Sequence, residues 1–263
     1  MGYFLFLKRL RVTSNASRNV LKLTSTYFDK STLRKLTSAK KSIAGKGLNG
    51  RSIIRTKGSI SKKHRLFNVA YNFRLLYPSL VSTFKLVPYS NKLLTLMVLP
   101  SGGLYYLPGL SKQKLFKVAS FKYFGGDFWS RKIEPTYTLI ALVKLFKKIS
   151  NFELWPRKGI QYARSAGSWG KVVRRDFESH TALVYLPSGV RKIISTFSVA
   201  LPSRCAAMDK RLLKNTKGGF YKSFGKKSIV RGVAMNPIDH PHGGRTKAIR
   251  YPRTPWGKTT KFK

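Results

Sequence analysis

Acidic residues are almost absent from this sequence. Only 8 Asp and Glu stand against 53 Lys and Arg among its 263 residues, which gives a formal net charge of +45 at pH 7. Self-repulsion at this charge opposes a compact fold unless a partner supplies negative charge. The shortage of acids therefore favours a polyanionic partner, and nucleic acid is the first candidate.

Cysteine and long apolar runs are also scarce. The single cysteine, Cys205, cannot build a disulfide framework, which argues against a small secreted cationic protein. The nearest apolar runs, Leu93 to Leu99 and Tyr137 to Phe146, are strand-sized and fall short of the roughly 18 residues of a spanning helix. No long amphipathic stretch accompanies the charge. We therefore predict no membrane partner.

The chain also lacks a constellation of catalytic residues or metal ligands. Asp239, His240 and His242 are neighbours, but a metal site normally needs three or four converging ligands. The other histidines, His64 and His180, lie in distant segments. No nucleophile motif, phosphate-binding glycine loop or paired carboxylate accompanies them, so acid–base catalysis lacks a partner and a pocket. We predict that the protein is not an enzyme and holds no metal.

What the sequence does contain is a β-rich middle. At 42% hydrophobic and 13% aromatic residues, it is more than a disordered basic tail. Short apolar runs separated by turn residues between Leu66 and Phe121 predict about five strands, enough for a small antiparallel barrel. A boundary is expected at residues 125–130, and a second strand-rich block continues to Phe197. One or two helical turns are expected at Met208 to Leu213.

The C-terminal segment, Val230 to Lys263, has the composition of an extended arm. It holds four of the chain's 12 prolines, and each proline fixes φ, removes a backbone donor and favours an extended residue before it. We expect neither a helix nor a central strand here. Its many cations face one acid, Asp239, so the arm needs an anionic surface to order it.

One stretch of this arm resembles a known signature. Residues 231–244, RGVAMNPIDHPHGG, closely resemble the C-terminal signature of the universal large-subunit ribosomal protein family number two, and TPWGK at 254–258 matches it in order and rough spacing. A match of this length is more specific than a short motif. Bacterial and plastid members usually continue with a further glycine and an acid. Arg245 and Thr246 follow here instead, which indicates a shorter or differently placed loop.

Two further stretches resemble the same family. ARSAG at 163–167 matches its second signature, and the hairpin at 171–197 follows with the family's spacing. The stretch at 45–65, GKGLNGRSIIRTKGSISKKHR, resembles the N-terminal segment, although the family's run of glycines is thinned to Gly58 and serines. The similarity covers roughly residues 45–257 and is weak at 130–155.

The resemblance implies a fold that the strand pattern alone would not distinguish from other small barrels. We predict a mostly β protein with an OB-fold barrel followed by an SH3-like barrel, and with extended basic N- and C-terminal arms. The expected parts are a basic N-terminal extension at 1–63, the OB-fold barrel at 64–126, the SH3-like barrel at 127–202 and the rRNA-binding tail at 203–263.

Residue chemistry indicates how RNA would be bound. Arg164 stands on a loop of small residues, where the backbone can approach a sugar-phosphate while the guanidinium reaches beyond it; a plain tight turn is the alternative. Neutral histidine donates, accepts and can stack on an exposed base. Asp239 can accept from base amino groups or hold a neighbouring histidine or arginine. We predict rRNA contacts for Arg51, Arg55, Lys62, Lys63, His64, Arg65, Arg164, Ser165, Arg231, Met235, Asn236, Asp239, His240, His242, Gly243, Gly244, Arg245, Trp256 and Lys258.

The resemblance also implies a function, that of a structural constituent of the large ribosomal subunit. It implies that the C-terminal loop lies near the peptidyl transferase centre, where RNA carries the chemistry and the protein supports RNA geometry and subunit association. The implied partners are large-subunit rRNA, neighbouring large-subunit ribosomal proteins and the small subunit at the intersubunit face. We predict no cofactor beyond magnesium ions associated with the rRNA. A role for His240 beyond structural support is a hypothesis.

Charge alone also fits a free RNA- or DNA-binding protein, such as an RNA chaperone. The Phe-, Tyr-, Lys- and Ser-rich composition and the thinned glycine motifs favour an organellar ribosome, in the mitochondrial matrix rather than a plastid. The first thirty residues resemble a mitochondrial transit peptide in composition. We expect them instead to be a retained basic arm, because a chain made inside an organelle needs no import signal.

Overall fold

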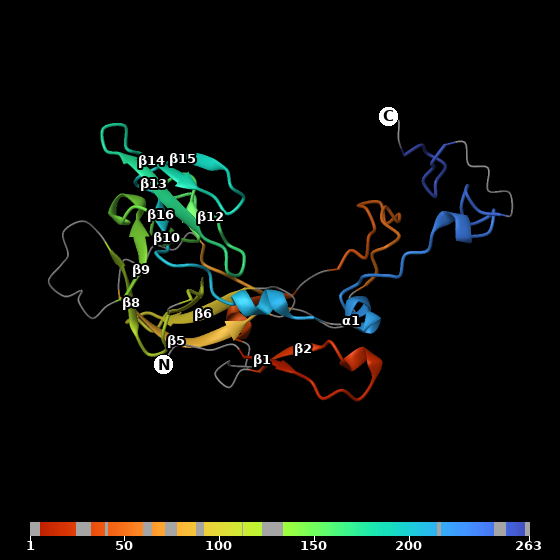
Figure 1. Ribbon diagram of the computed structural model, residues 1–263, viewed down its shortest axis with the longest axis horizontal. Coiled ribbons are helices and arrows are strands. Elements are labelled where there is room, and N and C mark those ends of the chain that lie inside the picture. The colour runs from red at the N-terminus through yellow and green to blue at the C-terminus, as the bar shows by residue number, and fades with distance from the viewer. Residues whose placement is uncertain are drawn as a thin grey trace. The chain divides into compact units, whose positions relative to one another are not determined.

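The computed structural model describes residues 6–24, 33–39, 42–59, 65–71, 78–87, 92–111, 113–122, 134–214, 217–244 and 251–260. Contacts divide the chain into two compact units (Figure 1). The first comprises Met1–Lys40 and Lys63–Thr216, and the second comprises Lys41–Lys62 and Lys217–Lys263. The boundary expected at 125–130 lies outside the described residues.

The largest sheet of the first unit has six strands in the order β16-β9-β8-β5-β6-β7. Only β8 and β9 pair in parallel. Strand β5 pairs with β6 along its length and with β8 at its first residues, with a bulge between Val81 and Thr83, and bulges bend a strand. The six strands are β5 (Ser79–Leu86), β6 (Leu93–Val98), β7 (Leu104–Pro108), β8 (Val118–Lys122), β9 (Glu134–Leu139) and β16 (Val199–Ala200).

A second sheet has four antiparallel strands in the order β10-β13-β14-β15. In β14, Ala182 and Val184 are buried while Tyr185 is exposed, the alternation expected of a strand with one face on a core. The register of β13 and β14 shifts between Val172 and Arg174. The four strands are β10 (Lys148–Ile149), β13 (Gly170–Asp176), β14 (Thr181–Tyr185) and β15 (Arg191–Ser195).

Two turns of the sequence LPSG close hairpins in these sheets. Gly102 has a φ of 81° and Gly189 a φ of 90°, a left-handed conformation that glycine adopts without a steric penalty. Each glycine N–H donates to the leucine carbonyl three residues earlier, Gly102 to Leu99 at 2.9 Å and Gly189 to Leu186 at 3.0 Å. The shared sequence thus reflects shared turn geometry.

Shorter elements complete the described chain. Three two-stranded sheets pair β1 (Phe6–Arg9) with β2 (Leu21–Thr24), β3 (Thr37–Ala39) with β4 (Arg65–Phe67), and β11 (Phe152–Glu153) with β12 (Ile160–Tyr162). The helical elements are α1 (Gly218–Ser223) and the 3-10 turns η1 (Asn15–Ser17), η2 (Arg34–Leu36), η4 (Ile140–Leu142), η5 (Met208–Leu212) and η6 (Gly232–Ala234). Turn η5 confirms the expected helical turn. The expectation of no helix in the C-terminal arm is wrong at η6, where a single turn precedes the prolines.

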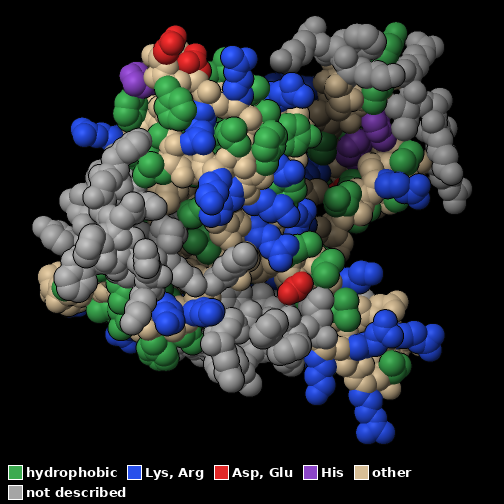
Figure 2. All heavy atoms as spheres, turned by 60° about the vertical axis from the view of Figure 1, so that its left-hand side comes forward, with side chains coloured by type: hydrophobic (Ala, Val, Ile, Leu, Met, Phe, Trp, Pro, Cys, Tyr) green, Lys and Arg blue, Asp and Glu red, His purple; other side chains and the backbone are tan. Residues whose placement is uncertain are grey.

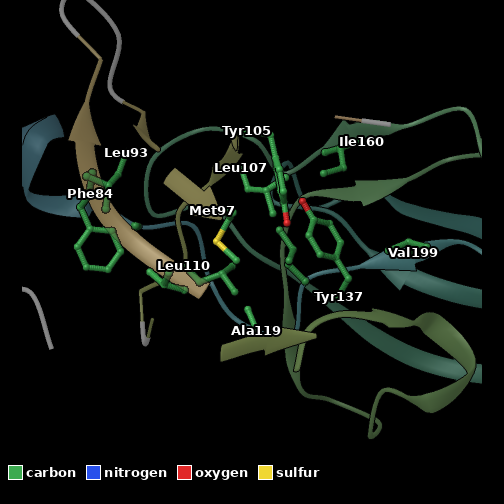
Figure 3. Close-up of a cluster of buried hydrophobic side chains, with 14 of the residues drawn as sticks. Phe84, Leu93, Met97, Tyr105, Leu107, Leu110, Ala119, Tyr137, Ile160 and Val199 are labelled. Atoms are coloured by element: carbon green, nitrogen blue, oxygen red, sulfur yellow. The ribbon is translucent and has the colours of Figure 1, made fainter. Parts of the chain in front are cut away.

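Two apolar cores support the sheets. The first packs Phe84, Met97, Leu107 and Tyr137 between the strands of the six-stranded sheet (Figure 3). The second gathers Ile149, Phe152, Val172 and Val184 under the four-stranded sheet. The chain passes between the cores in single steps, because Leu139 and Val199 belong to the first and their neighbours Ile140 and Ala200 to the second. The two cores therefore meet at residues 139–140 and 199–200, where β9 and β16 separate them.

The predicted fold class is confirmed, because the described residues are mostly β and form curled, largely antiparallel sheets of the barrel type. The residue boundaries of the four expected parts stay predictions. Within the described residues, no helix combines the length and the apolar character needed to cross a membrane.

Two leucines of β7 test the first core. Leu107 is fully buried and Leu104 is 42% exposed. We expect Leu107→Ala to lower the free energy of unfolding by about 2–5 kcal/mol, because it removes buried methyl groups and leaves a cavity. Leu104→Ala should change it by about 0.5 kcal/mol or less. Urea unfolding followed by circular dichroism, at one salt concentration, measures both. Equal losses would contradict the assignment of Leu107 to the core.

Candidate nucleic-acid interface

The loop at 163–167, between β12 and β13, presents the arginine predicted to bind RNA. Ala163 and Gly167 have positive φ angles of 48° and 70°, so the backbone turns sharply at both ends of the loop. Ala166 is buried, whereas Arg164 and Ser165 are exposed. The Ser168 N–H donates to the Ser165 carbonyl at 3.0 Å. The loop therefore holds the exposed Arg164 in a fixed turn.

Cys205 holds this loop in place through hydrogen bonds. Its thiol donates to the Ala163 carbonyl at 2.9 Å, and its sulfur accepts from the Asn151 side-chain amide at 3.2 Å. Its carbonyl accepts from the Gly167 N–H at 3.2 Å, and its N–H donates to the Ser168 carbonyl at 3.1 Å. Burial raises the pKa of the Cys205 thiol, which keeps the proton that the first bond needs. The loop is thus formed before any ligand arrives.

Two cations beside the loop share one aromatic ring. The Arg164 guanidinium lies 5.5 Å and the Lys92 ammonium 5.4 Å from the centre of the Tyr71 ring. The Lys92 ammonium also donates to the Tyr71 hydroxyl at 2.8 Å. The hydrogen bond places the Lys92 ammonium at the hydroxyl edge of the ring, whereas Arg164 makes the cation–π contact, and neither contact neutralises a positive charge. Sequence reasoning missed Lys92 and Tyr71, and no motif links residues so far apart in the chain.

A second such site could have been found from the sequence. The ring centre of Trp169 lies 4.9 Å from the Lys148 ammonium and 5.2 Å from the Lys171 ammonium. Trp169 and Lys171 are two residues apart at the start of a strand, and residues at that spacing share a face. The sequence WGK was therefore an available signal for a cation–aromatic pair.

In the second unit, the N-terminal stretch that resembles the family pairs with residues 225–227, just before the C-terminal arm. The Gly58 N–H donates to the Gly225 carbonyl at 2.8 Å, and the Lys227 N–H donates to the Thr56 carbonyl at 3.0 Å. An antiparallel bridge joins Lys57 to Lys226. The sequence did not predict that these two segments form one body.

This pairing accompanies a contact between two predicted RNA-binding side chains. The Arg55 guanidinium lies 5.3 Å from the ring centre of Trp256. Trp256 remains 52% exposed, so much of its indole is open to solvent. Arg51, Arg231 and Lys258 are also exposed in this unit.

The loop 231–244 is folded by its own backbone. The Gly243 N–H donates to the His240 carbonyl at 2.8 Å, and the Gly244 N–H to the Met235 carbonyl at 3.2 Å. A Cβ added at Gly243 would lie 2.2 Å from the Asn236 carbonyl oxygen. A Cβ added at Gly232 would lie 2.6 Å from the His240 ring. Only glycine permits these close approaches. The structure therefore explains why glycine stands at these two positions, which the sequence alone did not explain.

The two histidines of this loop act as hydrogen-bond acceptors. His240 Nδ1 accepts from the His242 N–H at 3.0 Å, and His242 Nε2 accepts from the Arg253 N–H at 2.8 Å. Their ring centres are 4.7 Å apart. Both rings must be neutral to accept at these atoms. Burial, and then the nearby His242 and Arg55, lower the pKa of His240, which favours the same neutral form.

The remaining predicted residues separate between the two units. Arg65 lies in the first unit, where it donates to the Thr37 hydroxyl at 3.1 Å. In the second unit, Met235, Asn236 and Asp239 lie on the loop, with Asn236 and Asp239 exposed. Four predicted residues lie outside the described residues, namely Lys62, Lys63, His64 and Arg245. Within the described part of the chain, no three His, Cys, Asp or Glu side chains gather as metal ligands.

Comparison with known proteins places this basic β chain among the ribosomal proteins. The family described as "Ribosomal Proteins L2, C-terminal domain" matches residues 137–257. The chain is 30% identical to the large ribosomal subunit protein uL2 of Bartonella henselae over 262 residues, which are 98% of this chain and 92% of that protein. It is 32% identical to uL2 of Parvibaculum lavamentivorans over 266 residues, 98% and 91% of the two chains. Identity to uL2 of Brucella melitensis reaches 45% over 118 residues, 44% of this chain and 42% of that protein. The chain belongs to the uL2 family, which confirms the resemblance drawn from the signatures.

The histidine contacts predict a pH dependence. Because the pKa of His240 is lowered in the folded chain, its contribution to the stability of the second unit is complete above the ordinary pKa of about 6.5. That contribution is lost as the pH falls from there through the lowered pKa of the folded chain. We expect the amides of 232–244 to exchange hydrogen faster at pH 5.5 than at pH 7.5, after correction for intrinsic rates. The histidine-free hairpin 93–108 is the control. In His240→Gln, whose side chain does not titrate, the dependence should weaken. Equal protection of these amides from exchange at both pH values would refute the predicted pH dependence.

Proposed function

We propose that this chain is a structural constituent of the large subunit of an organellar ribosome, held by large-subunit rRNA. The observation that supports this most directly is the second unit, in which both family-like arms join and present exposed cations beside Trp256. Aromatic rings next to cations bind the bases and phosphates of RNA together. Loop 163–167 adds a preformed arginine site in the first unit.

The distribution of charge supports a polyanionic partner. Lys and Arg side chains are spread over the face shown in Figure 2, whereas Asp and Glu occupy only small places on it. One of the few acids, Glu153, is buried, where its carboxylate accepts from the N–H groups of Gly159 at 3.2 Å and Val199 at 3.1 Å. It therefore serves the fold and does little to balance surface cations. RNA phosphates would supply the missing negative charge, and the counterions condensed on the RNA would be released when these cations bind.

The finer role of the C-terminal loop follows from its shape. The segment 231–244 is folded by its own backbone hydrogen bonds, with close approaches at Gly232 and Gly243. We propose that it supports RNA near the peptidyl transferase centre and contributes to association with the small subunit, next to other large-subunit proteins. The RNA would carry the chemistry, with no cofactor beyond rRNA-associated magnesium.

The proposed location is the mitochondrial matrix. The composition and the thinned glycine stretch support an organelle, while the relatives named above are bacterial. A plastid is the alternative. We keep the four expected parts, at 1–63, 64–126, 127–202 and 203–263, as the proposed domain organisation.

A free RNA- or DNA-binding protein is the second candidate, supported by the charge of +45. Salt separates the two. A free binder that makes around ten phosphate contacts loses roughly 10³ to 10⁵ in affinity between 50 and 200 mM salt. We expect this chain to sediment stoichiometrically with large subunits from an organellar lysate at high salt, and to lose that position after RNase treatment. Release by salt alone would favour the free binder.

The role of His240 can be measured in assembled ribosomes. We expect subunits with His240→Ala to assemble but to form peptide bonds more slowly, because loss of the ring removes the acceptor for the His242 N–H and loosens the loop. His180→Ala is the matched control, since His180 lies on an exposed turn of the first unit. Single-turnover peptide-bond formation on purified subunits gives the rate. Normal assembly with a normal rate would refute any contribution of the His240 ring to peptide-bond formation.

A further inference from the structure

A cavity opens in the first unit between loop 163–167 and the second LPSG turn. Its volume is about 890 Å³. Among the residues that line it are Lys92, Tyr162, Arg164, Leu186, Pro187 and Arg211. They come from four separate stretches of the chain, so no sequence motif marks the cavity as a whole.

Both rims of the cavity are rigid. Loop 163–167 is held by Cys205 through hydrogen bonds, as described above. On the opposite rim, the Leu186 N–H donates to the Val190 carbonyl at 2.8 Å, and the turn closes through Gly189. The cavity is therefore present without a ligand, which reduces the entropy lost when one binds.

Three cations converge on the cavity. Lys92 and Arg164 both contact Tyr71, Lys92 through a hydrogen bond to its hydroxyl and Arg164 through its ring. Arg211 belongs to turn η5, which packs against the loop, since a Cβ added at Gly167 would lie 3.0 Å from Met208 Cγ. The described residues that line the cavity include no acid. A phosphate would therefore be attracted from three directions, and the two arginines can bind it through two N–H groups each.

The walls between the cations suit a base. Leu186 and Pro187 supply apolar surface, and the polar backbone of residues 161–165 borders the space. The Tyr162 ring is fixed, because it stacks on Phe152 with ring centres 5.7 Å apart and an interplanar angle of 20°. The Lys192 ammonium donates to its hydroxyl at 2.8 Å. Apolar walls with a few placed polar groups are typical of small-ligand pockets of about 300–1,000 Å³.

We propose that this cavity takes one unpaired nucleotide of the RNA, with its base turned out of the helical stack and its phosphate on Arg164 and Arg211. An RNA duplex offers a protein mainly phosphates and 2′-hydroxyls along its outside, and such a surface does not enter a pocket of this size. Unpaired bases of bulges and loops do enter pockets. The inference rests on the proposed binding of rRNA and adds which element of that RNA is bound.

Photo-crosslinking in assembled large subunits tests it. A benzophenone amino acid replaces Ser188, on the cavity rim, or Glu178, an exposed residue on the turn at the other end of β14, as the control. We expect the crosslink from Ser188 to map to one nucleotide that is unpaired, and the Glu178 crosslink to map elsewhere. A Ser188 crosslink spread along a paired helix, made to a protein, or absent would overturn the inference. Absence of the chain from large subunits would instead refute the proposed function.

Substitutions in the cavity give a second readout. Ser188→Trp should block the cavity, so that the crosslinked base becomes open to chemical probing in assembled particles, while Ser188→Ala should leave it protected. Arg211→Ala should weaken binding of an rRNA fragment containing that nucleotide by about tenfold. Arg174→Ala, which removes an exposed arginine of β13 away from the cavity, should weaken it less. Equal losses for both arginines, together with unchanged probing in Ser188→Trp, would show a general charge effect only and overturn the inference.

Discussion

Unbalanced positive charge is the constraint on which this structure depends. With so few carboxylates in the sequence, many cations are held by neutral groups instead. The Lys210 ammonium donates to the Val87 carbonyl at 2.6 Å, and its burial lowers its pKa to about 8. The Arg175 guanidinium donates to the Ala141 carbonyl, and other cations lie against the rings of Tyr71, Trp169 and Trp256. Carbonyls and rings orient a cation but leave its charge uncompensated. The exposed cations among those on rings, such as Arg55 and Arg164, remain available to phosphates.

Burial of apolar surface is the main favourable contribution to folding. The two apolar cores therefore stabilise the first unit against repulsion between its cations. They also position the loop that carries Arg164. Phe152 and Ile160 both precede that loop in sequence and are buried in different cores, Phe152 in the second and Ile160 in the first. Cys205 and Asn151, both buried, then hold the loop through hydrogen bonds. The loop's shape is thus a consequence of core packing, and a change in either core would alter the position of Arg164.

Local patterns made the strands and turns predictable. Alternation in β14 and the LPSG turns need only neighbouring residues, and the signatures at 163–167 and 231–244 are continuous in sequence. What the sequence did not show depends on residues that are distant in the chain. The pairing of Lys57 with Lys226, the sharing of Tyr71 by Lys92 and Arg164, and the place of Arg211 beside the cavity have no periodic signal. The acceptor role of the His240 ring depends on one hydrogen bond, which composition cannot reveal.

The second unit is organised differently from the first. The buried apolar clusters of the described residues all belong to the first unit. The second unit relies on backbone hydrogen bonds between its two segments, on close contacts at Gly232 and Gly243, and on the lone pairs of two neutral histidines. Single hydrogen bonds contribute only about 0.5–1.5 kcal/mol each, so such a body has little stability of its own against its net charge. Binding to RNA would add stability by mass action. The second unit is thus shaped by its own glycines and histidines, and a bound polyanion would stabilise that shape.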